Sequence, residues 1–181
     1  MNLAHVHLIL NHVPILTIPM ATLFLIYALW QKNNPLKRFS LLVLIATAAT
    51  AVPVYLTGEP AENIVKHFPG VSMDLIEAHE DSAEFSLIVT LVCGALAITT
   101  LLFQKRVVVA KLLTKATIFA ALIAVVSLGY TANLGGKIRH PEIVDINSQK
   151  VNQNLDMKNG TKNAQLSVAD KASERMTKKN Q

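Results

Sequence analysis

Charge is scarce in this chain. Only 16% of its 181 residues are Asp, Glu, Lys or Arg, whereas 51% are hydrophobic. That balance is too apolar for an ordinary soluble domain, and the length leaves room for no more than one compact unit. The composition therefore indicates a small membrane protein.

Cysteine is almost absent as well. Cys93 stands alone, so it cannot form an intramolecular disulfide and indicates no redox compartment. The N-terminus lacks a basic n-region and a small-residue cleavage site, so the first apolar run is predicted to be a retained span and not a signal peptide. Basic residues outnumber acidic ones by five, yet they are dispersed and form no recognisable nucleic-acid module, which excludes nucleic acid as a partner.

The sequence contains four long apolar runs. A helix needs about 20 residues to cross the hydrocarbon core of a bilayer. Four runs approach that length, and Lys115, near one end, is the only charged residue in them. The sequence predicts an all-α, four-helix transmembrane bundle over residues 1–141, embedded in the lipid bilayer. The runs are Leu8 to Trp30, Phe39 to Leu56, Phe85 to Phe103 and Leu112 to Leu134.

The charges are sorted between the loops. The segments 31–38 and 104–115 hold seven basic residues and no acid, whereas Thr57 to Glu84 holds seven acids and one lysine, Lys66. Basic loops tend to stay in the cytoplasm. We therefore expect both termini and the acidic loop on the outer face. The polar residues 142–181 are predicted to be a flexible tail, with a short helix near Leu166 to Met176.

Three helix boundaries can be read locally. Asp74, with Glu77 three residues later, is typical of an N-cap, which predicts a helix from about Leu75 to Phe103. Gly135 or Gly136 is predicted to end the last helix as a left-handed cap. For the first span two interpretations stay open: Pro14 lies inside one continuous helix, or it marks the true first turn.

The small residues of the spans also allow two interpretations. Counting from His79 at helical spacing gives a face of small side chains, and the fourth span repeats the pattern. Such faces either let membrane helices approach closely or form a groove for a flat cofactor. The residues are Ala83, Ser86, Thr90, Cys93, Gly94 and Ala97 in the third span, Thr117, Ala120, Ala121, Ala124, Ser127 and Thr131 in the fourth, and 46–53 in the second.

All the histidines fall on the predicted outer half. Ionisable groups in or beside a span are costly and usually functional, and imidazole is the commonest metal ligand. Two imidazoles from facing helices suffice as axial ligands of haem. We expect His12 to pair with His79 at a deeper site and His7 with His140 at a shallower one. Lys66, Lys137 and Arg139 are predicted to meet the propionates. The six histidines are His5, His7, His12, His67, His79 and His140.

The leading hypothesis is thus a membrane electron-transfer protein with one or two b-type haems, more an electron carrier or accessory subunit than a stand-alone enzyme. Its redox partner would be quinone or a periplasmic protein. Two alternatives stay open. The chain could be a cofactor-free accessory subunit that packs on a larger respiratory complex through its small-residue faces. It could also handle copper or zinc through the acids of 77–84.

The motifs "HLILNHVPIL", "TGEPAE", "EAHEDSAE" and "LGGKIRH" carry a family resemblance. Over residues 5–141 the chain resembles a family of uncharacterised bacterial four-helix membrane proteins, in which His-x4-His-x-Pro opens the first span and Gly-Gly with a following His ends the last. His7, His12, His79 and His140 match those positions. Val13 stands where the family often has Phe, and His-Pro where it often has His-Gly. The resemblance implies a four-helix fold in the bacterial inner membrane with histidine-centred sites, and no established reaction.

Overall fold

A computed structural model describes residues 3–68, 70–140 and 157–158 of the chain. All the secondary structure in these residues is helical. Contacts divide the chain into two units, Met1–Arg139 and His140–Gln181, and each is described by itself. In the second unit Met157 and Lys158 are helical and exposed, and the predicted helix at 166–176 lies outside the described residues. The helices of the first unit are α1 Leu3–Leu10, α2 His12–Trp30, α3 Asn34–Leu56, α4 Gly58–Val65, α5 Met73–Leu102 and α6 Val107–Arg139.

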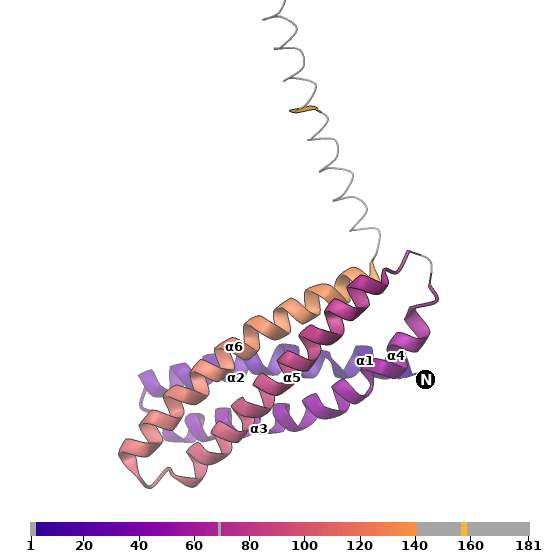
Figure 1. Cartoon of the computed structure of the whole chain (residues 1–181). Coiled ribbons are helices and arrows are strands. Elements are labelled where there is room, and N and C mark those ends of the chain that lie inside the picture. The colour runs from indigo at the N-terminus through magenta and orange to yellow at the C-terminus, as the bar shows by residue number, and fades with distance from the viewer. Residues whose placement is uncertain (1–2, 69, 141–156, 159–181) are drawn as a thin grey trace, which may run out of the picture. The chain divides into compact units, whose positions relative to one another are not determined.

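The four predicted spans are confirmed as helices long and apolar enough to cross a membrane. They run over Ala4–Trp30, Asn34–Val65, Met73–Leu102 and Val107–Arg139. The helices extend past the apolar runs because polar residues at their ends continue the helical hydrogen bonding. α5 packs against α3 and α6, and α2 packs against α3 and α6, which closes a four-helix bundle (Figure 1).

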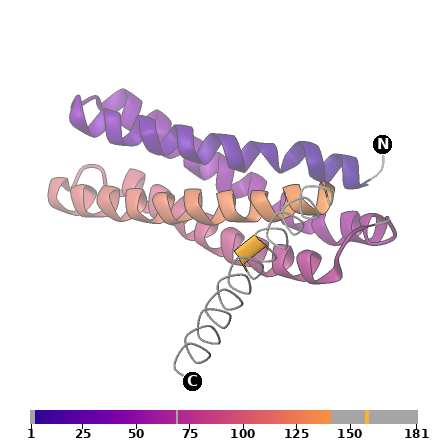
Figure 2. The same ribbon diagram turned by 90° about the horizontal axis from the view of Figure 1, so that it is seen from above.

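The first span is interrupted at Asn11, between α1 and α2. Pro14 has no N–H, so the carbonyl of Leu10 loses the partner that a continuous helix would give it. The helix re-forms at once, with Pro14 buried in the first turn of α2. Both interpretations are therefore confirmed in part: the chain is helical before and after Asn11, and Pro14 lies in the first turn of α2. The break lets α1 pack mainly on α4, which follows α3 (Figure 2).

Two predicted boundaries are wrong. α5 begins at Met73 with Ser72 in the extended N-cap position, so Asp74 lies in the first turn, where a carboxylate also favours the helix dipole. α6 continues through both glycines to Arg139, and Gly70 is the one described glycine with a positive φ. The glycines carry no cap because Lys137 and Arg139 stabilise the last turn in their place.

The small-residue faces form the contacts between helices. Ser86, Thr90, Cys93 and Ala97 of α5 are at most 1% exposed. A Cβ added to Gly94 would lie 2.5 Å from the Cβ of Ala48, so α3 and α5 approach as closely as their backbones allow. At these positions the small side chains serve close helix packing, the first of the two interpretations. The cofactor groove and the docking of another subunit through small-residue faces stay predictions.

Candidate histidine site

Two imidazoles from different helices lie at one end of the bundle. His7 projects from α1 and His79 from the first turns of α5, and the two side chains are close enough to interact electrostatically. Both are partly buried. The sequence predicted that His79 pairs with His12, and that pairing stays a prediction; the structure brings His7 near His79. We call this pair and the groups that hold it the histidine site.

His7 is held by the end of α3. Its Nδ1 lies 3.0 Å from the carbonyl oxygen of Val54 and 3.2 Å from Oγ1 of Thr57. The carbonyl oxygen of Val54, in the last turn of α3, also accepts from the Thr57 hydroxyl at 2.8 Å, so three groups meet at this point. A carbonyl only accepts, so Nδ1–H donates and the lone pair of the neutral ring lies on Nε2.

His79 is held in the same way by α6. Its Nδ1 donates to the carbonyl oxygen of Thr131 at 3.0 Å. The Thr131 hydroxyl in turn bonds to Ser82 at 2.6 Å and to Ser86 at 3.0 Å, which ties α5 to α6 around the imidazole. This ring too is left with its lone pair on Nε2.

Gly135 makes room for the His79 ring. A Cβ at this position would lie 3.1 Å from Cε1 of His79, closer than nearly all real Cβ contacts. Glycine was expected here as a helix cap, but its function in the structure is to let an imidazole lie against the α6 backbone. Gly58 lies near His7 more loosely, with 3.8 Å from its added Cβ to Cε1.

The arrangement is that of two oriented ligands. Ligating histidines nearly always donate their other ring N–H to a carbonyl or carboxylate, which fixes the tautomer and makes the ligating nitrogen more basic. His7 and His79 each meet that condition through a neighbouring helix. Among the described residues no hydrogen bond involves either Nε2. The pair can therefore accept a metal or a metal-containing cofactor.

Asn11 adds a polar group that the sequence analysis missed. It follows His7 by four residues, so both side chains lie on the same face. Its Oδ1 is buried and has no hydrogen-bond partner in the described residues. An unpaired buried acceptor is costly, so the position calls for a donor from water or from a ligand. The four-residue spacing in "HLILN" was the signal that could have found it.

The other predicted residues do not join the pair. His12 is exposed, and its Nδ1 bonds to the carbonyl oxygen of Leu8 in the preceding turn at 2.7 Å. His140 is exposed and belongs to the second unit, so its pairing with His7 stays a prediction. Lys66 ends α4 with Nζ 2.6 Å from Oδ1 of Asn63. Lys137 and Arg139 lie in the last turn of α6, at the end where Thr131 holds His79.

The acidic residues of segment 77–84 were the alternative candidates for a metal site. Over residues 3–68, 70–140 and 157–158 no group of three or more His, Cys, Asp or Glu side chains is arranged to hold a metal ion. Glu77, Glu80 and Glu84 are exposed on α5. Glu80 lies near Glu62 of α4.

Replacing Gly135 with alanine tests the fit around His79. The added methyl should push the imidazole away from α6 and lengthen its bond to Thr131. Because the loss of an orienting partner typically costs about 10- to 100-fold in ligand affinity, we expect a drop of that order in the affinity for the group that His79 binds. Titration of the purified variant with haem or with metal measures it. Gly136→Ala is the matched control, since a Cβ there meets nothing within 4 Å; equal losses in both variants would contradict the packing role of Gly135.

Comparison with known families gives one match. A family model described as "Predicted membrane protein (DUF2231)" matches residues 4–145. Neither the curated proteins nor the solved structures gave a match to the chain. The predicted resemblance to an uncharacterised membrane family is confirmed at this level, and its individual motifs stay predictions.

Proposed function

The chain belongs to this family of predicted membrane proteins, and on that premise we propose that it is a membrane electron-transfer protein that binds a b-type haem through His7 and His79. One observation carries the proposal: two imidazoles on different helices lie near each other, and each has its Nδ1 within hydrogen-bond distance of a carbonyl oxygen. Histidine is a common ligand of haem iron, and helical bundles build cofactor sites from side chains on facing helices.

The residues around the pair fit a haem at the end of the bundle. α1 packs mainly on α4 and α2 and makes no extensive contact with α5 or α6, so the close helix packing of the bundle core does not extend between the two ligand-bearing helices. Asn11 offers an unpaired buried oxygen one turn from His7. Lys66, Lys137 and Arg139 supply the positive charge that propionates need. His12 and His140 remain predicted ligands of a second haem.

When bound, haem would supply reversible one-electron transfer. His7 and His79 would hold the iron, while Val54 and Thr131 keep both rings in one tautomer. We place the site at the periplasmic face of the bacterial inner membrane, from the charge asymmetry of the loops. Quinone or a periplasmic redox protein would then exchange electrons with it.

The optical spectrum of the detergent-purified protein, expressed with ample haem, tests this function. We expect reduced-minus-oxidised bands of b-type haem at one haem per chain or more. Copper or zinc in metal analysis without haem bands would overturn the proposal in favour of metal handling by the same two imidazoles. Neither haem nor metal would favour a cofactor-free accessory subunit.

A further inference from the structure

One end of the bundle carries positive charge without any counter-charge. The turn between α2 and α3 and the turn between α5 and α6 both lie at this end (Figures 1 and 2). Nε of Arg38 donates to Oε1 of Gln104 at 2.8 Å, which ties the start of α3 to the second turn. Every acid of the described residues lies between Glu59 and Glu84, beyond the far end of α3. We call this end the basic end, and its cations are Lys32, Lys37, Arg38, Lys105, Arg106, Lys111 and Lys115.

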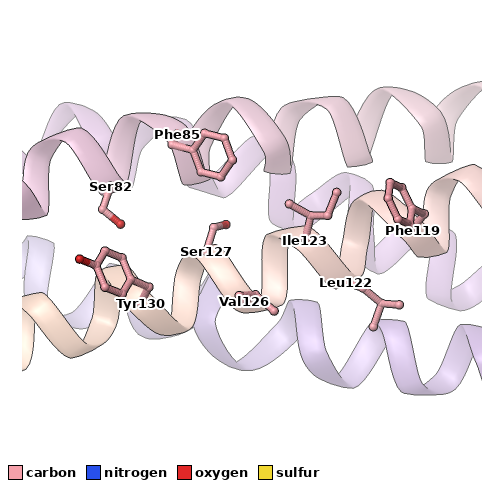
Figure 3. Close-up of a pocket in the computed structure, with 8 residues that line it drawn as sticks. All are labelled: Ser82, Phe85, Phe119, Leu122, Ile123, Val126, Ser127 and Tyr130. Carbon is pink, nitrogen blue, oxygen red and sulfur yellow. The ribbon is translucent and has the colours of Figure 1, made fainter.

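We propose that the basic end binds the phosphate groups of anionic phospholipids in the leaflet that surrounds it. The apolar surface of the bundle does not discriminate among lipids. The groove between α5 and α6, for example, is lined mainly by apolar side chains (Figure 3), and the acyl chains of any lipid suit it. Discrimination therefore falls to the level of the head groups.

The cations lie at that level. Trp30, two residues before Lys32, is 77% exposed, and Leu102, three residues before Lys105, is 72% exposed. Exposed aromatic and apolar side chains followed directly by charge are typical of the membrane–water interface. α3 and α6 both begin at this end, and side chains on a helix lean toward its N-terminus, so the long basic side chains reach toward the head groups. Lipid phosphates are the anions found at this depth.

The backbone at Lys32 is an independent sign that charge is needed in the first turn. Lys32 is the one non-glycine residue of the described chain with a positive φ, at 53°. It directly follows the C-cap of α2, and the N–H of Asn33 bonds to the carbonyl oxygen of Ala28 at 2.8 Å. Glycine is favoured at such a position because a side chain is strained there. The chain thus keeps a cation where the fold alone favours glycine.

Several donors at the basic end are available to phosphate oxygens. Gln104 takes only Nε of Arg38, which leaves the terminal nitrogens of a guanidinium that suits two phosphate oxygens. Arg106 lies over the ring of Phe103, 5.8 Å from its centroid, which holds its guanidinium at the second turn. Neither α3 nor α6 has an acid in its first turn. The positive ends of two helix dipoles therefore add to the cations.

Quenching of Trp30 fluorescence tests this inference, because Trp30 is the only tryptophan in the chain. The full-length protein is placed in phosphatidylcholine vesicles that contain brominated phosphatidylglycerol or, in the matched set, brominated phosphatidylcholine. We expect the anionic lipid to reach Trp30 with a relative affinity about tenfold higher or more, because several cations act together and each contributes up to about fivefold, or about 1 kcal/mol. High salt should reduce the preference.

Lys32→Gly separates the effect of charge from that of folding. Glycine relieves the strained turn, so the stability should stay equal or rise. The preference for phosphatidylglycerol should nevertheless fall about two- to fivefold. Lys37→Gln, which removes a partly buried cation of α3, should cause a similar fall. Lys158→Gln removes the same charge from the second unit and is the matched control, which should keep the preference.

Equal quenching by the two brominated lipids would overturn the inference. Loss of the preference in millimolar inorganic phosphate at constant ionic strength would overturn it too, because the basic end would then bind a soluble anion. Equal losses in Lys32→Gly and Lys158→Gln would contradict it as well, since the preference would then follow only the net charge of the protein. None of these measurements depends on bound haem, so the result stands apart from the test of the proposed function.

Discussion

His79→Ala is expected to abolish the b-type haem bands, and His7→Ala is expected to do the same. Each substitution removes one of the two proposed ligand nitrogens, together with the imidazole that donates to the carbonyl of Thr131 or Val54. The loss should be nearly complete and not graded, because a haem held by a single imidazole in an open site exchanges readily into detergent. The measurement is the haem-to-protein ratio of each purified variant, together with its reduced spectrum.

The matched controls are His12→Ala and His67→Ala. Both residues are exposed and bond only to a carbonyl in their own preceding turn, so both variants should keep the bands. Added imidazole should restore part of the spectrum to His79→Ala if the protein is otherwise folded. Bleaching by His12→Ala with normal spectra from His7→Ala would return the assignment to the pair first predicted from sequence.

Gly94→Leu is expected to destabilise the bundle more than any substitution on its outer surface. A Cβ alone would lie 2.5 Å from that of Ala48, and neither side chain can rotate away. α3 and α5 must therefore separate, and the interhelical packing is lost along with their contact. Overpacking of a closed interface costs about 1–3 kcal/mol, and we expect about 3 kcal/mol or more here. Reversible unfolding in mixed micelles, followed by circular dichroism, measures the change.

Ala95→Leu is the control for this variant, because Ala95 is the next residue on α5 and is exposed. It should change the free energy of unfolding little. The pair Gly94→Ala and Ala48→Gly offers a second check, since the double variant moves the methyl group from one helix to the other. Recovery of most of the stability lost in Gly94→Ala is expected, and the absence of any coupling would contradict the close approach of α3 and α5.

The histidine site was predicted in part. The residue types and the predicted end of the bundle followed from the charge asymmetry and from the position of His7 and His79 before their apolar runs. The proximity of His7 to His79 did not follow, because helical periodicity only shows that His7 and His12 point in different directions. Which of them lies nearer His79 depends on how the helices pack. Val54 and Thr131 escaped prediction because their contribution is a carbonyl, which every residue has.

The structural role of Gly135 also could not be predicted from the sequence. Its place near the end of an apolar run favours a cap, and in the structure the helix passes through it because His79 needs the space. The sequence alone determined that four helices are long and apolar enough to span a membrane, since apolar length and the cost of unpaired backbone groups in lipid are properties of each segment. Only the tertiary structure decided how closely the faces of small residues approach each other and which imidazoles lie near each other. Both depend on distances between helices, which the sequence of a single helix does not contain.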